Sequence, residues 1–301
     1  MTSPTTRKQL VIASILMALS ALPASLAAAP QRPSPSNSPA GIVALQQEIV
    51  SRLSGASELR PGIRLANRSS IENRQEARAF LSELFKRFGL DPKRQAYGVE
   101  GENIFAVLSC GKPAAAAVVF GAHYDTARTS PGANDNASGV AAVAAVAQQM
   151  KRVRKRSRDV IFVFFDEEER GLRGSRAFAQ LLKDEGRIVH SVHTIDQMGW
   201  DQDGDRAIEL EVPYDGAQEL YASAAKALKM NITIHITKET GSDHSAFRKL
   251  GFKAVGITEE YRNKDTTPFI HRPGDTYETM NFDYLASTTS LVAKALEMLV
   301  R

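Results

Sequence analysis

The sequence contains a single cysteine, Cys110, among its 301 residues. An intramolecular disulfide is therefore excluded, and so is a zinc finger built from several cysteines. The chain also has little net charge, because 38 Lys and Arg residues face 34 Asp and Glu residues and leave a charge of +4. A balance this even predicts no surface dedicated to nucleic acid. With 43% hydrophobic and 24% charged residues, the composition is that of a globular protein and excludes collagen-like, low-complexity and polytopic membrane proteins.

Residues 1–29 have the pattern of a secretory signal peptide. Arg7 and Lys8 precede an apolar run over residues 10–22, and small residues follow it. The run is short for the ~30 Å of a membrane core, which favours a cleaved signal over an uncleaved membrane anchor. Residues 30–40 are rich in Pro and Ser and predict an extended linker. We therefore expect an exported protein, periplasmic or extracellular.

Residues 41–301 show no internal repeat and no second linker, which predicts a single domain. The run over 160–165 is apolar without alternation, as is typical of a strand buried on both faces. Helical periodicity is found at 41–54, 71–88, 137–153, 174–185, 216–229, 243–250 and 282–300. Strand-like segments are found at 103–109, 115–123, 159–166, 192–199, 207–213, 231–237 and 252–258. This alternation predicts an α/β layer fold.

Residues with metal-binding chemistry follow several of the strand-like segments, where sites gather in α/β sheets. His123 and Asp125 end one segment, and the carboxylate could accept the second ring N–H of the histidine. Asp135 lies in a turn rich in Gly and Asn before a helix, where an N-cap is the alternative role. Each of these features alone is more often structural.

Four adjacent acids, residues 166–169, end the next segment. Their mutual repulsion indicates a bound cation, and the alternative is an acidic loop exposed to solvent. Asp196 ends another segment, and His271 lies in a loop before the last helix. Two histidines and three acidic positions from five strand ends or loops make a mixed nitrogen and oxygen site, which suits zinc, cobalt or manganese. Five ligands exceed the need of one catalytic zinc and indicate two metals that share a carboxylate.

As a set, these segments resemble the secreted co-catalytic di-zinc aminopeptidases, whose relatives include the glutaminyl cyclases. The resemblance covers roughly residues 100–280, in the order of the family. It implies an α/β fold of three layers, the α/β/α zinc exopeptidase fold, with a mixed, mostly parallel central sheet flanked by helices. The segments that carry it are Gly-Ala-His123-Tyr-Asp125, Pro-Gly-Ala-Asn-Asp135-Asn-Ala-Ser-Gly, Glu168-Glu169-Arg-Gly-Leu-Arg-Gly-Ser, Ile-Asp196-Gln-Met-Gly, Ser242-Asp243-His244 and His271-Arg-Pro-Gly-Asp275-Thr.

The resemblance also implies a role for each matching residue. Counting back from Gly-Leu-Arg-Gly-Ser places the general base and the neighbouring ligand at Glu168 and Glu169; a register slipped by one would make Glu167 the base. The implied roles are His123 and Asp196 as ligands of one zinc, Glu169 and His271 as ligands of the other, Asp135 as the bridge between both zinc ions, Glu168 as the general base and Asp125 as the residue that orients His123.

The activity implied is that of an exported, zinc-dependent aminopeptidase, a hydrolase that removes the first residue of peptides with a free N-terminus through a metal-activated water. We expect a monomer with no membrane partner beyond the export signal. Tyr261 could stabilise the oxyanion, although a packed core position is the alternative. Glutaminyl cyclase chemistry on one zinc, held by Asp135, Glu169 and His271, remains an alternative activity. Further alternatives are a carboxypeptidase or amidohydrolase of this fold and a binding ectodomain without catalysis.

Overall fold

The computed structural model describes Met1 and residues 39–301. The predicted signal peptide and most of the predicted linker lie outside the described residues. Helix α1 begins at Pro39, so the last two residues of the linker expected at 30–40 belong to this helix instead. Within the part of the chain that is described, no helix has both the length and the apolar character needed to cross a membrane.

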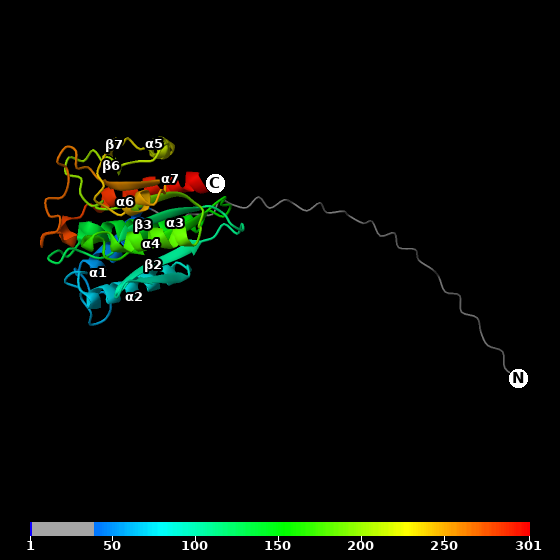
Figure 1. Ribbon diagram of the computed structural model, residues 1–301, viewed down its shortest axis with the longest axis horizontal. Helices are drawn as coiled ribbons and strands as arrows, with labels where there is room; N and C mark the ends of the chain where they lie inside the picture. Colours follow the sequence, from blue (N-terminus) through cyan, green and yellow to red (C-terminus); the bar gives the residue numbers. More distant parts are fainter. Residues whose placement is uncertain (2–38) are drawn as a thin grey trace. The chain divides into compact units, whose positions relative to one another are not determined.

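An eight-stranded sheet, in the order β1-β2-β4-β3-β5-β8-β6-β7, forms the centre of residues 39–301 (Figure 1). Its strands are β1 (Pro92–Tyr97), β2 (Gly101–Leu108), β3 (Ala117–His123), β4 (Asp159–Phe165), β5 (Val189–Ile195), β6 (Ile208–Glu211), β7 (Ile234–Thr237) and β8 (Ala254–Glu259). The pairs β3–β4, β3–β5, β5–β8 and β6–β7 are parallel, and the other three pairs are antiparallel. The predicted mixed, mostly parallel sheet is confirmed.

Two hydrophobic layers cover the two faces of the sheet. The helices are α1 (Pro39–Leu53), α2 (Ile71–Arg87), α3 (Gly139–Met150), α4 (Arg173–Asp184), α5 (Ala217–Leu228), α6 (His244–Lys249) and α7 (Phe282–Val300). Along β4, Phe162 and Phe164 face the layer with α1, α2, α3, α5 and α7, whereas Ile161 and Val163 face the layer with α4 and α6. Because successive strand residues alternate between faces, β4 is buried on both sides, as its sequence predicts.

Local hydrogen bonds explain where two of the helices begin and end. The side chain of Ser70 accepts the N–H of Asn73 at the start of α2, and Asn281 accepts the N–H of Tyr284 at the start of α7. Gly89 follows α2 with φ of 66°, which ends the helix as predicted, since only glycine adopts this conformation without strain. The helical segments predicted at 71–88 and 282–300 therefore agree with the structure to within one residue.

One strand escapes the sequence pattern. Strand β1 lies at the edge of the sheet and pairs only with β2. Its sequence, Pro-Lys-Arg-Gln-Ala-Tyr, is mostly polar, and none of its residues is fully buried. An edge strand gains its stability from backbone pairing rather than from burial, so it lacks the apolar signal that marks the other strands.

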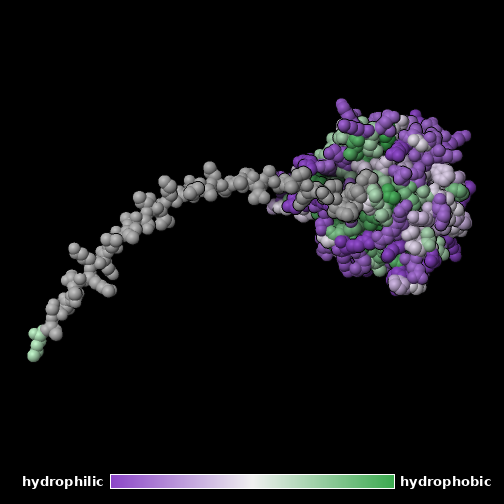
Figure 2. Space-filling view, turned by 180° about the vertical axis from the view of Figure 1, so that it is seen from behind, coloured by the Kyte–Doolittle hydropathy of each residue, from purple (hydrophilic) through white to green (hydrophobic). Residues whose placement is uncertain are grey.

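The surface of the described part is mixed in character. Figure 2 shows hydrophilic and hydrophobic residues interspersed over the visible face. Large hydrophobic residues that are exposed, among them Val99, Ile188 and Met298, come from separate segments of the chain. Apolar residues exposed singly are ordinary for a globular protein and indicate no function by themselves.

Candidate metal centre

The candidate ligands gather at one edge of the sheet because the parallel strands β3, β4 and β5 end there. His123 is the last residue of β3, and Asp196 directly follows β5. Glu169 lies in a short helical turn after β4. Asp135 lies in the kinked helical turn Ala133–Ser138 that precedes α3, and His271 comes from the loop region before α7. The structure thus brings together all five residues that the resemblance implies as ligands.

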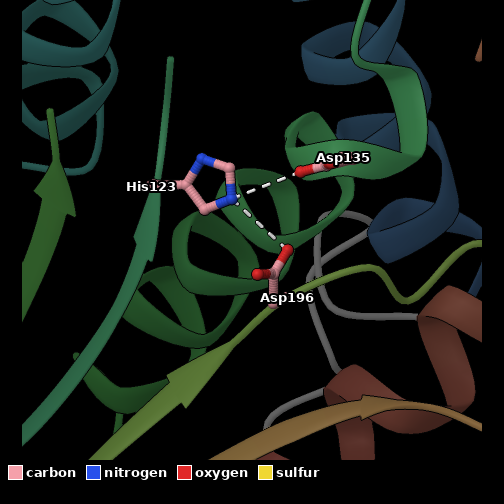
Figure 3. A group of neighbouring side chains, drawn as sticks. All are labelled: His123, Asp135 and Asp196. Carbon is pink, nitrogen blue, oxygen red and sulfur yellow. Dashed lines mark ion pairs between the residues drawn. The ribbon is translucent and has the colours of Figure 1, made fainter. Parts of the chain in front are cut away.

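His123, Asp135 and Asp196 form the first group of candidate ligands, which we call the first group of ligands. Figure 3 shows both carboxylates directed toward the same ring nitrogen of His123. The His123 Nε2 atom lies 3.3 Å from Asp135 Oδ1 and 3.4 Å from Asp196 Oδ1. The candidate ligand atoms of this group all lie within 4.8 Å of one another, which is the spacing of ligands around a single cation.

Asp135, Glu169 and His271 form the second group of candidate ligands, which we call the second group of ligands. The His271 Nε2 atom lies 3.1 Å from Asp135 Oδ2 and 3.1 Å from Glu169 Oε2. The other carboxylate oxygen of Glu169 accepts the N–H of Ala127 at 2.9 Å, which fixes the side chain. Asp135 therefore directs one oxygen to each group, so the two groups share this carboxylate.

The donor atoms of the first group fit a bound cation. Neither ring nitrogen of the buried His123 has a hydrogen-bond partner among the described residues, and the same holds for Asp196 Oδ1. Buried polar atoms are nearly always paired, so an unpaired nitrogen facing unpaired carboxylate oxygens indicates a ligand. Imidazole nitrogen together with carboxylate oxygen is a donor set that suits Zn²⁺.

The protonation of the site reflects its crowded carboxylates. Burial lowers the pKa of His123, but the carboxylates of Asp196 and Glu168 outweigh burial and raise the pKa well above its usual value. Asp135 and Glu169 raise the pKa of His271 to about 10. Burial raises the pKa of Glu168 to about 10, although His123 opposes this shift. The carboxylates therefore favour positive charge at this position, which a divalent cation can supply in place of protons.

Asp125 has more partners than the sequence indicates. It lies 3.5 Å from His123 Nδ1, beyond the length of a good hydrogen bond. Its two oxygens accept the backbone N–H groups of Glu168 at 3.0 Å and Glu169 at 3.2 Å. Asp125 thus connects the end of β3 to the turn after β4, and it fixes the backbone of both glutamates.

The four acids after β4 separate into two pairs with different surroundings. Asp166 accepts a hydrogen bond from Arg78 and pairs with Arg74 at 2.9 Å. Glu167 pairs with Arg74 at 3.3 Å and with two further arginines, and it does not line the cavity described below. Glu168 does line this cavity. Arginines therefore balance Asp166 and Glu167, while Glu168 and Glu169 face the candidate metal centre.

Asp275 holds the loop that carries Asp135, a role that the sequence did not reveal. Its buried carboxylate accepts the backbone N–H of Asn134 at 2.7 Å and that of Asp135 at 3.0 Å. The only sequence signal is its place in the segment that begins with His271. Since the loop carrying His271 also carries Asp275, one candidate ligand of the second group and the backbone support of Asp135 depend on the same segment.

Arg68 is a second buried residue that sequence reasoning missed. Its guanidinium donates to the backbone carbonyls of Tyr124 at 2.6 Å and Gly132 at 2.8 Å, and also to those of Leu53 and Pro131. Burial lowers its pKa to about 10, so the group remains positively charged at neutral pH. The guanidinium therefore ties the chain between β3 and Asp135 to the rest of the fold.

Replacement of Arg68 by glutamine should destabilise the protein strongly. Four buried carbonyls would lose their donor, and we expect Arg68→Gln to lower the free energy of unfolding by about 3 kcal/mol or more. Urea denaturation followed by circular dichroism measures this change. The matched control is Arg64→Gln, since exposed Arg64 donates to two loop carbonyls, and we expect a much smaller loss. Equal losses in both variants would contradict the role given to Arg68.

A cavity of about 470 Å³ opens beside the candidate ligands. Tyr261 lines the cavity, whereas Phe252, Ile257 and Phe269 do not. Ile257 and Phe252 pack in the two hydrophobic layers, and Phe269 contacts Trp200. The wall contains instead many acidic residues, with Leu172 and Ile270 as its aliphatic side chains.

Comparison with known proteins gives one family match. The sequence profile described as peptidase family M28 matches residues 103–296. Among curated proteins, Aminopeptidase YwaD of Bacillus subtilis is 30% identical over 183 residues, which cover 58% of this chain and 39% of that protein. The chain spans less than two thirds of the length of the curated relatives it matches.

Two solved structures illustrate the likeness in fold. The zinc aminopeptidase BSAP from Bacillus subtilis has a TM-score of 0.62 at 24% identity, and the match covers 66% of this chain and 50% of that one. The glutaminyl cyclase of Porphyromonas gingivalis has a TM-score of 0.70 at 17% identity, with 86% of this chain and 98% of that one covered. At these identities the likeness shows a common fold.

Proposed function

This chain belongs to peptidase family M28, and from that premise we propose that it is a zinc aminopeptidase that removes the first residue of peptides with a free N-terminus. The shared Asp135 carboxylate is the observation that carries the proposal, because each of its oxygens faces a separate group of ligands. This arrangement supports two zinc ions per chain. His123 and Asp196 would hold one ion, Glu169 and His271 the other, and Asp135 both.

The proposed mechanism assigns proton transfer to Glu168. Bound zinc supplies Lewis-acid chemistry, which polarises a carbonyl group and lowers the pKa of water. Glu168 takes a proton from the attacking water and later gives it to the leaving amine. Asp125 keeps Glu168 in place through the backbone, and the surrounding carboxylates attract the α-ammonium group of the substrate.

Glutaminyl cyclase activity is the nearest alternative, since that chemistry needs only the group of Asp135, Glu169 and His271. The aminopeptidase is favoured because the first group, His123, Asp135 and Asp196, is also present, and neither ring nitrogen of His123 has a hydrogen-bond partner among the described residues. A binding ectodomain without catalysis would have no use for either group, so a measurement of bound zinc addresses that alternative.

The test is mass spectrometry of two short peptides incubated with the purified protein and zinc. One peptide begins with Leu and the other with Gln, and an N-acetylated copy of the Leu peptide is the control. Stepwise loss of first residues from both free peptides, with the acetylated copy intact, is the expected result. Loss of ammonia from the Gln peptide alone would instead identify a cyclase. If every peptide stays intact while zinc is bound, the proposed substrate class is wrong.

Tyr261 is a candidate to stabilise the oxyanion of the reaction. It lines the cavity, and its hydroxyl donates to Gln197 Oε1 at 2.6 Å. The hydroxyl would have to leave Gln197 in order to donate to the substrate. If it does so in the transition state, Tyr261→Phe lowers kcat at least ~10-fold with little change in KM. Steady-state kinetics on a Leu substrate measure the effect, and unchanged turnover would remove the role.

We also propose that the protein is exported and acts as a monomer. The support for export is the sequence of residues 1–29, with its basic residues, apolar run and small residues. Fractionation of cells that produce the full chain, with mass spectrometry of the mature N-terminus, tests export. Full-length protein retained in the cytoplasm would contradict it.

A further inference from the structure

The cavity beside the candidate metal centre extends to a second group of acidic residues. Glu209 and Glu211 from β6 and Glu239 beyond β7 line it, and we call these three residues the acidic wall. None of them belongs to either group of metal ligands. The cavity therefore joins the site of peptide-bond cleavage to a separate patch of negative charge.

The pleat of β6 directs two of these side chains into the cavity. Ile208 and Leu210 point to the hydrophobic layer with α5 and α7, so Glu209 and Glu211 point to the opposite face. Glu211 lies opposite Gly256 of β8, and its Oε2 atom takes the space that a side chain at Gly256 would need. The strand pairing thus makes room for a carboxylate at this position.

Glu211 is nine-tenths buried and lacks a hydrogen-bond donor. Its Oε2 atom has no hydrogen-bond partner among the described residues and lies 3.3 Å from His244 Nδ1, which also has none. The other ring nitrogen of His244 faces the carbonyl of Glu239 at 3.2 Å, so that nitrogen carries the proton. Burial lowers the pKa of His244 to about 4, so the ring is neutral. When Glu211 is ionised, two acceptors therefore face each other without a donor, and burial raises the pKa of this carboxyl to about 8 in the absence of a compensating cation.

The rest of the acidic wall is also without a cation. Glu209 is fully buried, and one of its oxygens accepts the backbone N–H groups of Tyr261 and Arg262. Among residues 39–301, no lysine or arginine forms an ion pair with Glu209, Glu211 or Glu239. Buried carboxylates are costly unless a positive charge compensates them. A positively charged group of a ligand would compensate the acidic wall.

We propose that the acidic wall is the subsite for the side chain of the substrate's first residue, and that it selects lysine and arginine. This inference rests on the proposed aminopeptidase function. The α-ammonium group of a peptide must lie near the scissile bond, whereas a long side chain can extend away from it along the cavity. Lysine and arginine end in several N–H donors on a positive charge, which is what the facing acceptors of Glu211 and His244 lack.

The test compares each basic residue with a neutral residue of similar shape. We expect kcat/KM for 4-nitroanilides of lysine and arginine to exceed those of norleucine and citrulline at least ~10-fold. In Glu211→Gln this preference for lysine over norleucine should fall at least ~10-fold, and in the exposed Glu239→Gln about 3-fold. Glu219→Gln, which removes an exposed charge on α5, is the matched control and should keep the preference.

Binding measurements separate the failure of the subsite from the failure of the proposed function. Calorimetry compares L-lysinamide with L-norleucinamide on the zinc-loaded protein and on Glu211→Gln. If norleucine substrates are cleaved as well as lysine substrates, the subsite is wrong and the aminopeptidase stands. If no substrate is cleaved, the proposed aminopeptidase function is wrong. The subsite would then still be supported if lysinamide binds at least ~10-fold more tightly than norleucinamide and this difference is lost in Glu211→Gln. Equal binding of both amides overturns it.

Discussion

Glu168→Gln is expected to lower turnover at least ~100-fold while the zinc content of the protein stays unchanged. Glutamine keeps the size of the side chain but cannot take a proton from water. The residue lies outside both groups of ligands, and its backbone N–H still donates to Asp125 in the variant. Steady-state kinetics on a Leu substrate and elemental analysis of the purified protein measure the two quantities.

Glu167→Gln is the matched control, because it places the same substitution one residue earlier. Glu167 faces three arginines outside the cavity, so this variant should lose stability and keep most of its turnover per folded molecule. The opposite result, with Glu167→Gln inactive and Glu168→Gln active, would show that the register is slipped by one residue. Near-normal activity in both variants would remove the general base from this turn.

Asp135→Asn is expected to weaken zinc binding at least ~100-fold and to abolish activity in step with the lost metal. Aspartate offers one oxygen to each group of ligands, whereas asparagine offers one oxygen and one amide group that cannot bind a cation. The variant should therefore keep at most one zinc where the parent protein holds about two. Elemental analysis after gel filtration and competition with a chelator provide the measurement.

Asp275→Asn tests whether the loss comes from the ligand itself or from its loop. Asp275 supports Asp135 through two backbone N–H groups and takes no part in either ligand group. We expect its replacement to weaken zinc binding about 10-fold, less than the loss in Asp135→Asn.

The bridging role of Asp135 would be contradicted if the parent protein holds one zinc, or if the Asp135→Asn variant retains two.

Residues at the end of a strand or directly after it could be predicted from the sequence. His123, Asp196 and the acids after β4 lie where parallel strands end, and such ends meet at one edge of the sheet. The apolar run of β4 likewise revealed its burial on both faces. In these cases a local pattern determines where the side chain lies, and no knowledge of distant contacts is needed.

The supports of the site could not be predicted in this way. Asp275 binds backbone atoms more than fifty residues away along the chain, and so does Arg68 at three of its four carbonyls; a hydrogen bond to a backbone carries no sequence pattern. The alternation Ile-Glu-Leu-Glu of β6 is readable, and it places both glutamates on one face. Whether that face meets the cavity depends on the pairing of β6 with β8, a strand that comes later in the chain.

The hydrogen bonds from Asn134 and Asp135 to Asp275 bear on the order of events during synthesis. A growing chain that ends before residue 271 contains β3, β4 and β5, yet it lacks the last ligand and the support of Asp135. The second group of candidate ligands can therefore form only when residues 271–275 are available to fold. The proposed hydrolytic activity would then require synthesis to pass residue 275, and shorter nascent fragments would be inert.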